Sequence, residues 1–491
     1  MALRVLQIGA IAVVLVATVH PSFDLDRFLV PKELVLHVTA LIAGALTWRF
    51  RQLARADYAL LGFLLLSALS LAAATNPWLA FRALALSVSS YVIFRAARAV
   101  PAEPLLNALA LAVVLAAVTA LLQAYGIWLP FFTENRAPGG TLGNRNFVGH
   151  AAAFGLPLVL LAAMRGRRLA PFGVAIVTAA LILTRSRAAW IAAAAVALIF
   201  VAGMIWRARM WRRLGLVALF AIAGAVAALL LPNTLRWRSD NPYLDSVKGV
   251  TAYEQGSGRG RLVQYQRSLR MAAANPIVGV GAGNWAVEYP EFAGRSDPSL
   301  DDNEAGMTTN PWPSSDWIAY VSERGFIATL LLGLALLAIA WQRSDDALYD
   351  ITRVATLAGA ITTGALDAVL LLAAPALIVW AALGALQVER RASARREDEP
   401  PPRPQPLATF ALALLLVVTF TAVVRSASQW AAIEVSKSDT ARAAAIDPFN
   451  YRLRMRLARG GRRKSRCEHA RAAHALFPNA VAARNLAAGC D

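Results

Sequence analysis

Long hydrophobic runs alternate with short polar connections along most of this chain, and one long polar stretch, Leu231 to Gly325, interrupts them. A membrane-spanning helix needs about 17–25 predominantly apolar residues. Runs close to this length lie near residues 4–20, 33–48, 58–75, 79–97, 104–126, 146–164, 169–185, 188–206, 214–231, 318–341, 351–369, 371–387 and 407–424. The pattern predicts an all-α polytopic membrane protein with about 12–13 transmembrane helices.

Composition supports the same class. The 491 residues are 58% hydrophobic and only 16% charged, which is too apolar for a soluble globule of this length. The net charge of +19 does not predict nucleic-acid binding, because the basic residues form short clusters between apolar runs. We therefore expect membrane lipids around the chain and no nucleic-acid partner.

The basic clusters predict a topology. They follow the second, fourth, sixth and eighth runs and fill the loop at 388–406. Short loops rich in Lys and Arg stay in the cytoplasm, so the N-terminus is predicted inside and the long polar stretch outside. Four parts follow: N-terminal transmembrane helices at 1–231, a large outer loop at 232–316, C-terminal transmembrane helices at 317–424 and an outer helical tail at 425–491.

The tail is Ala-rich with helical periodicity, and its segment ARAAAIDPFNYRLRMRLAR resembles a fragment of tetratricopeptide repeats. One or two such units do not build a solenoid, so we expect a small docking or capping module that recruits an envelope protein. The two cysteines of the chain, Cys467 and Cys490, both lie here. They either form a disulfide that closes a helical hairpin or remain two surface thiols, and the sequence leaves both alternatives open.

Three Gly/Ser/Arg-rich segments lie at predicted outer helix ends or in the outer loop: 139–146, 184–187 and 256–262. Arginine offers planar, bidentate donors that suit phosphate oxygens. The segments are therefore candidates for one site that binds a lipid diphosphate. Taken singly, Arg185 and Arg187 are also explained as anchors at a helix end, and Arg259 and Arg261 as solvated loop residues.

Four stretches in this order, GTLGNRNFVGH, LTRSRAAW, GRLVQYQRSLRMAAANPIVGVGAGNW and DWIAYVSERG, resemble the O-antigen ligase and polymerase family. The resemblance implies a metal-independent glycosyltransferase of the bacterial inner membrane that uses an undecaprenyl-diphosphate-linked glycan as donor. Its active face and tail are then periplasmic. Arg187 and Arg261 match the family's two essential arginines, which hold the diphosphate as it leaves.

Further site residues follow from the same segments. We expect Arg185 and Arg259 to assist in diphosphate binding. Four residues are expected to support the site: Asn144, Asn146, Ser186 and Ser314. The glycine-rich PIVGVGAGN segment is interpreted as a structural turn.

The family's usual histidine is missing: its place falls on Ser314 or Trp312, and no histidine occurs between Ala151 and Arg466. Asp316 is the predicted general base and Glu323 the second candidate, because a carboxylate can take a proton from a sugar hydroxyl. The alternatives are a helix N-cap for Asp316 and an ion pair with Arg324 or a loop arginine for Glu323.

The predicted reaction is ligation of the glycan to a hydroxyl of lipid A core. Polymerisation of O-antigen or exopolysaccharide and protein O-oligosaccharyl transfer remain alternatives within the class, and a transporter or a non-catalytic scaffold remain alternatives outside it. No cofactor is expected, since the sequence contains no P-loop, HExxH motif or metal-spaced Cys/His set. His37 and His150 are expected to be packed or pore-facing, and Asp367 is a candidate to line the site.

Overall fold

The computed structural model describes residues 1–18, 26–48, 53–237, 239–249, 256–294, 296–387, 406–460 and 463–490. Over these ranges the chain forms α-helices and no β-strand, apart from a single bridge between Leu300 and Thr308. The basic loop predicted at 388–406 lies outside the described residues except for Pro406, and so do Arg49 and Arg51 of the basic cluster that follows the second apolar run. The predicted all-α class is confirmed.

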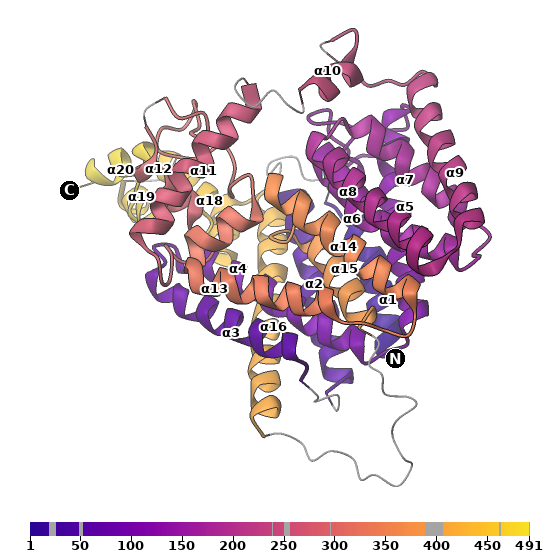
Figure 1. The fold of residues 1–491 in the computed structure, drawn as a ribbon. Helices are drawn as coiled ribbons and strands as arrows, with labels where there is room; N and C mark the ends of the chain where they lie inside the picture. The colour runs from indigo at the N-terminus through magenta and orange to yellow at the C-terminus, as the bar shows by residue number, and fades with distance from the viewer. Residues whose placement is uncertain are drawn as a thin grey trace. The chain divides into compact units, whose positions relative to one another are not determined.

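Each of the thirteen predicted apolar runs contains a helix (Figure 1). These are α1 (Ala2–Leu15), α2 (Asp26–Leu46), α3 (Arg55–Leu69), α4 (Pro77–Arg98), α5 (Ala102–Ala124), α6 (Arg145–Met164), α7 (Ala170–Thr184), α8 (Arg187–Gly203), α9 (Trp211–Leu230), α13 (Asp316–Trp341), α14 (Ala347–Leu366), α15 (Ala373–Ala385) and α16 (Pro406–Val435). Within the described ranges, nine helices are long and apolar enough to cross a membrane, and α1, α7 and α15 are shorter apolar helices. The chain is a polytopic membrane protein.

The remaining helices belong to the polar loop and the tail. They are α10 (Pro242–Lys248), α11 (Gly256–Ala274), α12 (Trp285–Phe292), α17 (Thr440–Ile446), α18 (Tyr451–Gly460), α19 (Arg463–Leu476) and α20 (Val481–Ala488). The chain divides into two compact units. Unit 1 comprises residues 1–57, 88–250 and 335–420, and unit 2 comprises 58–87, 251–334 and 421–491.

Unit 1 is built around α6, which packs against α5, α7, α8 and α14. One end of this unit carries basic side chains joined to acidic ones. Arg167 pairs with Glu103 at 2.7 Å, and Arg207 pairs with Asp350 at 2.5 Å. The first pair joins the connection after α6 to the start of α5, and the second joins the segment after α8 to the start of α14. The charge pattern assigned the segments after α6 and α8 to the cytoplasmic side. We call this the basic end of unit 1.

The opposite end of unit 1 joins the connections after α5 and α9. The side-chain oxygen of Gln123 accepts hydrogen bonds of 2.8 Å from the backbone N–H groups of both Gly139 and Gly140. The N–H of Thr234 donates to the carbonyl of Ala124 at 2.9 Å. The turn before α6 and the segment after α9 are thereby fixed against the end of α5. We call this the polar end of unit 1.

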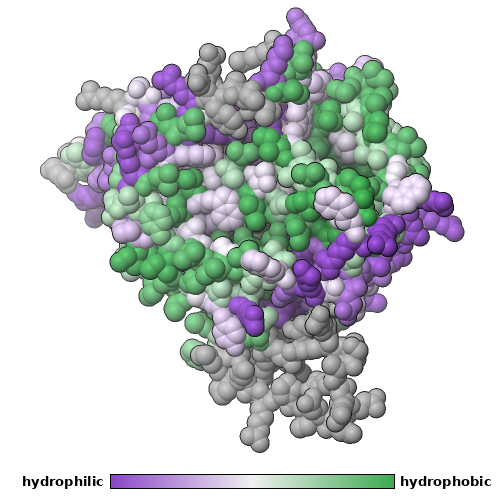
Figure 2. Space-filling model, in the orientation of Figure 1, coloured by the Kyte–Doolittle hydropathy of each residue, from purple (hydrophilic) through white to green (hydrophobic). Residues whose placement is uncertain are grey.

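Unit 2 contains the polar-loop helices α11 and α12 and the tail helices α17 to α20. Figure 2 shows hydrophobic side chains over α3 and α13 and hydrophilic ones over α11 and α12. The tail packs on the loop through polar contacts. The hydroxyl of Tyr451 donates to Glu304 at 2.5 Å, and the N–H of Val481 donates to the carbonyl of Ala305 at 2.9 Å.

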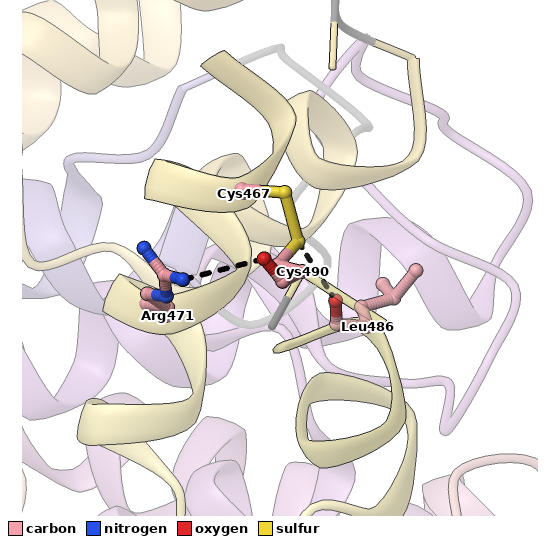
Figure 3. The surroundings of a disulfide bond; sticks show 4 residues. All are labelled: Cys467, Arg471, Leu486 and Cys490. Carbon is pink, nitrogen blue, oxygen red and sulfur yellow. Dashed lines mark hydrogen bonds between the residues drawn. A yellow bond between two sulfur atoms is a disulfide. The ribbon is translucent and has the colours of Figure 1, made fainter. Parts of the chain in front are cut away.

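A disulfide closes the tail. Cys467 in α19 is bonded to Cys490, just after α20 (Figure 3). Arg471 donates a hydrogen bond of 3.4 Å to the carbonyl of Cys490, as drawn in the same view. Of the two alternatives that the sequence left open, the structure therefore has the disulfide rather than two separate thiols.

Candidate functional site

The predicted site residues belong to both units. Asn144, Asn146, Arg185, Ser186 and Arg187 lie in unit 1 at its polar end. The other predicted residues lie in unit 2: Arg259, Arg261, Ser314, Asp316 and Glu323. Neither group contains a set of three or more His, Cys, Asp or Glu side chains placed to hold a metal ion, within the ranges that the structure describes.

The junction of α7 and α8 is a tight turn made by Thr184, Arg185 and Ser186. Arg185 has a left-handed backbone, with φ of 53°, which is uncommon for a residue other than glycine. Thr184 Oγ1 accepts a hydrogen bond from the N–H of Ser186 at 3.3 Å, and the Ser186 side chain is buried. Residues kept in such backbone conformations are enriched at binding and catalytic sites.

Both arginines of this junction contact the loop segment between α9 and α11. Arg185 Nε donates to Ser246 Oγ at 3.0 Å, and its guanidinium lies 4.5 Å from the ring centre of Trp237. Arg187, the first residue of α8, donates to the carbonyl of Gly249. Burial lowers the pKa of Arg185 from its ordinary value, although Tyr243 and Asp245 oppose that shift. The junction therefore carries partly desolvated positive charge.

The two asparagines have different roles. Asn144 is the N-cap of α6, because its side chain accepts from the N–H of Asn146 at 3.0 Å. Asn146 Nδ2 donates to Asp367 Oδ2 at 3.4 Å. Asp367 follows α14 and its side chain is 15% exposed, while His150 Nε2 lies 3.8 Å from the same oxygen. The structure thus gathers a histidine, an asparagine and a carboxylate at the polar end of unit 1.

In unit 2, α11 connects Arg261 with the Ser314 segment. Gln264 Oε1 accepts from the N–H of Ser314 at 2.6 Å, and the hydroxyl of Tyr265 donates to the carbonyl of Ser314 at 2.6 Å. These residues follow Arg261 by three and four positions, so all three share one face of α11. A cavity of about 410 Å³ is lined by Arg259 together with other residues of this loop domain.

Asp316 is the first residue of α13, and its side chain is fully buried. Ser315 Oγ accepts from the N–H of Ile318 at 3.4 Å, so a capping side chain lies one residue before Asp316, for which a cap was the alternative to the predicted general base. Asp316 lies close enough to Tyr320 and Arg324 for electrostatic interaction. Its carboxylate is therefore part of a buried polar group on α13.

Glu323 has two backbone partners in addition to the charge of the neighbouring Arg324. Its carboxylate accepts hydrogen bonds from the N–H groups of Gly283 at 2.8 Å and Trp285 at 3.3 Å. Arg324 interacts electrostatically with Glu323 and donates to the carbonyl of Ala83 at 3.3 Å. Glu323 thus fixes the glycine-rich turn against α13.

The glycine-rich turn is structural, as interpreted from the sequence. The N–H of Val280 donates to the carbonyl of Ser322, and that of Phe326 donates to the carbonyl of Pro276. Between these bonds Gly325 leaves helical geometry, with φ of 83° and ψ of 170°. This backbone region is essentially restricted to glycine.

Sequence reasoning missed three features. Trp237, which contacts Arg185 and Arg145, was not predicted. Neither was Gln264, and no local pattern indicated its bond to Ser314. His150 and Asp367 were noted separately, but nothing in the sequence paired residues so far apart.

The comparisons with known proteins point to one family. The family model described as O-antigen ligase matches residues 172–333, which include TRSR, GRL and the glycine-rich turn but not GNRN. No curated protein matches the chain. The family supports membrane glycosyltransferase activity of the ligase or polymerase type, on polysaccharide and lipid-linked substrates. This match over residues 172–333 agrees with the resemblance to the O-antigen ligase and polymerase family that the motifs indicated.

Proposed function

We propose that this protein transfers a glycan from undecaprenyl diphosphate to a hydroxyl acceptor, with lipid A core as the favoured acceptor. The observation that carries the proposal is the family match, which contains both TRSR with Arg187 and GRL with Arg261. Arg187 is the first residue of the apolar helix α8, and Arg261 lies in α11 of the polar loop.

In the proposed reaction, an acceptor oxygen attacks the anomeric carbon of the donor. The bond from that carbon to the diphosphate oxygen breaks, and the diphosphate leaves with the electron pair. Arg187 and Arg261, assisted by Arg185 and Arg259, bind the diphosphate and stabilise the charge that develops on it. The acceptor proton passes to a carboxylate, which acts as general base.

The carboxylate of Glu323, the second candidate from the sequence, already accepts from two backbone N–H groups, which leaves two carboxylates as candidates for that base. Asp316 was predicted, and it lies in the segment that α11 positions, but its side chain is fully buried. Asp367 is 15% exposed and has His150 and Asn146 beside it. Exposure favours Asp367, because a general base must come within hydrogen-bond reach of the hydroxyl that it deprotonates.

The proposed location is the bacterial inner membrane with the polar end of unit 1, the loop helices and the tail in the periplasm. Two observations support it. The basic end of unit 1 collects the Arg-rich connections, which remain cytoplasmic in polytopic proteins. The tail contains a disulfide, and disulfides persist in oxidising compartments such as the periplasm.

The test is glycan analysis of a deletion strain complemented with wild type or with single variants, separating surface polysaccharide from carrier-linked glycan. Arg187→Ala and Arg261→Ala are expected to abolish transfer while the protein still accumulates in the membrane. Asp316→Asn and Asp367→Asn identify the base. Arg167→Ala, which removes an exposed arginine at the basic end, is the matched control and is expected to retain transfer.

The length of the glycan that remains on the carrier lipid distinguishes ligation from polymerisation. Loss of a ligase leaves long chains on the carrier, whereas loss of a polymerase leaves single repeat units. Purified protein in proteoliposomes then separates an enzyme from a transporter or a scaffold, because only an enzyme converts the added donor. Full transfer by both Arg187→Ala and Arg261→Ala contradicts the proposed mechanism.

A further inference from the structure

An open cavity of about 380 Å³ lies at the polar end of unit 1. Its walls come from three separate stretches of the chain. The connection between α5 and α6 supplies Trp128 and Arg136, the first residue of α6 supplies Arg145, and the segment after α9 supplies Arg236 and Trp237. None of these residues was assigned to the donor diphosphate above.

The cavity has an excess of positive charge. Three arginines and one carboxylate, Glu134, line it. Within the described ranges, Arg136, Arg145 and Arg236 form no ion pair. The charges of Arg136 and Arg185 both repel that of Arg145. Bringing like charges together is unfavourable, and a bound anion would offset that repulsion.

Arg145 and the loop that carries Arg136 are held in place by contacts within the protein. The guanidinium of Arg145 lies 5.1 Å from the ring centre of Trp237, and Arg185 contacts the same ring. The loop that carries Arg136 is fixed by Gln123, which binds Gly139, Gly140 and the carbonyl of Thr133. A site whose side chains and backbone are already ordered loses less entropy on binding.

An aromatic side chain gives the cavity a second chemical character. Trp128 lines it and is 47% exposed, so its indole is available to a ligand. A flat apolar ring suits the C–H face of a sugar, while guanidinium groups suit a phosphate or carboxylate. A phosphatidylglycerol headgroup would use the arginines but has no ring to place against Trp128.

We propose that this cavity is a subsite for an anionic saccharide, a sugar that carries a phosphate or carboxylate group. The proposal rests on the proposed glycan transfer, and it adds that the donor glycan or the acceptor is acidic near the reacting end. Arg136, Arg145 and Arg236 bind the anionic group, and Trp128 packs against the sugar ring.

The experiment measures sugar binding to the full chain in phosphatidylcholine nanodiscs by saturation-transfer NMR and titration. The probes are glucose 6-phosphate, glucuronic acid, glucose and inorganic phosphate. We expect each charged sugar to bind at least about tenfold more tightly than glucose, and Arg145→Gln or Arg136→Gln to remove most of that difference. Arg167→Gln is the matched control and is expected to bind as wild type.

Trp128→Ala distinguishes a charged sugar from free phosphate as the ligand of the cavity. It is expected to weaken binding of the charged sugars while inorganic phosphate still binds. Equal binding of glucose and the charged sugars overturns the proposal. The proposal is also overturned if inorganic phosphate is the only probe that binds and Trp128→Ala leaves its binding unchanged. Complete competition by phosphatidylglycerol in the nanodisc overturns it as well, because that result would identify a lipid headgroup as the ligand.

The proposed glycan transfer and the proposed sugar subsite can be contradicted independently. Glycan transfer that survives both Arg187→Ala and Arg261→Ala contradicts the proposed function, whatever the sugar-binding result. Sugar binding that survives both Arg145→Gln and Arg136→Gln contradicts the cavity proposal, whatever the transfer result.

Discussion

Gln264 accepts a hydrogen bond of 2.6 Å from the backbone N–H of Ser314, fifty residues further along the chain. The same side chain donates to Ser299 Oγ at 3.1 Å, and it is buried. Gln264 therefore fixes two separate parts of the loop to α11, one turn after Arg261. It is a positioning residue, since its polar atoms are occupied by the protein itself.

We predict that Gln264→Leu lowers glycan transfer by about ten- to a hundredfold, because a small displacement of catalytic groups costs that much. Gln264→Glu keeps an acceptor for the Ser314 N–H and is expected to restore part of the activity. The measurement is the transfer rate in proteoliposomes at matched protein amounts.

Gln266→Leu provides the control, because Gln266 is exposed on the same helix. It is expected to transfer glycan at the wild-type rate. If Gln264→Leu and Gln266→Leu behave alike, the bond to Ser314 has no positioning role.

The kink of α13 gives a prediction about stability. A Cβ on Gly325 would lie 2.2 Å from the carbonyl oxygen of Ile277, and the backbone there has φ of 83°. Gly325→Ala is expected to lower the free energy of unfolding by about 2 kcal/mol or more, from strain and overlap together. The measurement is thermal unfolding in detergent, with comparison at matched protein and lipid concentrations.

Gly333 lies further along the same helix, and no described atom lies within 4 Å of the place of its Cβ. Gly333→Ala is expected to be neutral or to stabilise by up to about 1 kcal/mol, because alanine favours helix. Equal destabilisation by the two alanine variants would show that the kink geometry at Gly325 is not required.

The helices could be predicted from the sequence because the signal for each is local. A run such as 104–126 contains the whole apolar length of α5, and no distant residue is needed to recognise it. The N-terminal end of α13 shows where prediction from local sequence stops. A polar residue before an apolar run indicates a cap, but the pattern does not separate Ser315 from Asp316, and the capping side chain is Ser315.

The site was only partly predictable for a different reason. Arg185 and Arg187 stand out because arginines at a predicted outer helix end are exceptions to the charge bias of this chain. Trp237 beside Arg185, by contrast, is a contact between residues far apart in the sequence, and no periodicity encodes it. Burial is equally non-local, so the sequence could nominate Asp316 as a base but could not indicate that its side chain is enclosed.

The disulfide predicts how the tail responds to reduction. Cys467 and Cys490 are separated by 23 positions, and closing a loop of this length stabilises a folded segment by about 3 kcal/mol in the chain-entropy description. Cys490→Ser is expected to speed hydrogen exchange in α19 and α20 more than in α12. Cys467→Ser and the double variant should give the same increase, since each removes the same bond. Exchange that is unchanged in all three variants would contradict this role.

The stability of the tail should also depend on pH through His469. Arg454 Nη1 lies 2.8 Å from His469 Nδ1, and burial together with the charge of Arg454 lowers the pKa of His469 below its ordinary value. Because the folded tail binds this proton less readily than the unfolded tail, the stabilisation is complete above about pH 6.5 and is lost as the pH falls through the lowered pKa. Once exchange rates are corrected for the slower intrinsic exchange at lower pH, the protection of α18 and α19 in the full chain is therefore expected to fall on acidification. In His469→Gln, which cannot titrate, that loss of protection should be smaller, and an identical pH dependence in the two proteins would assign the effect to other groups.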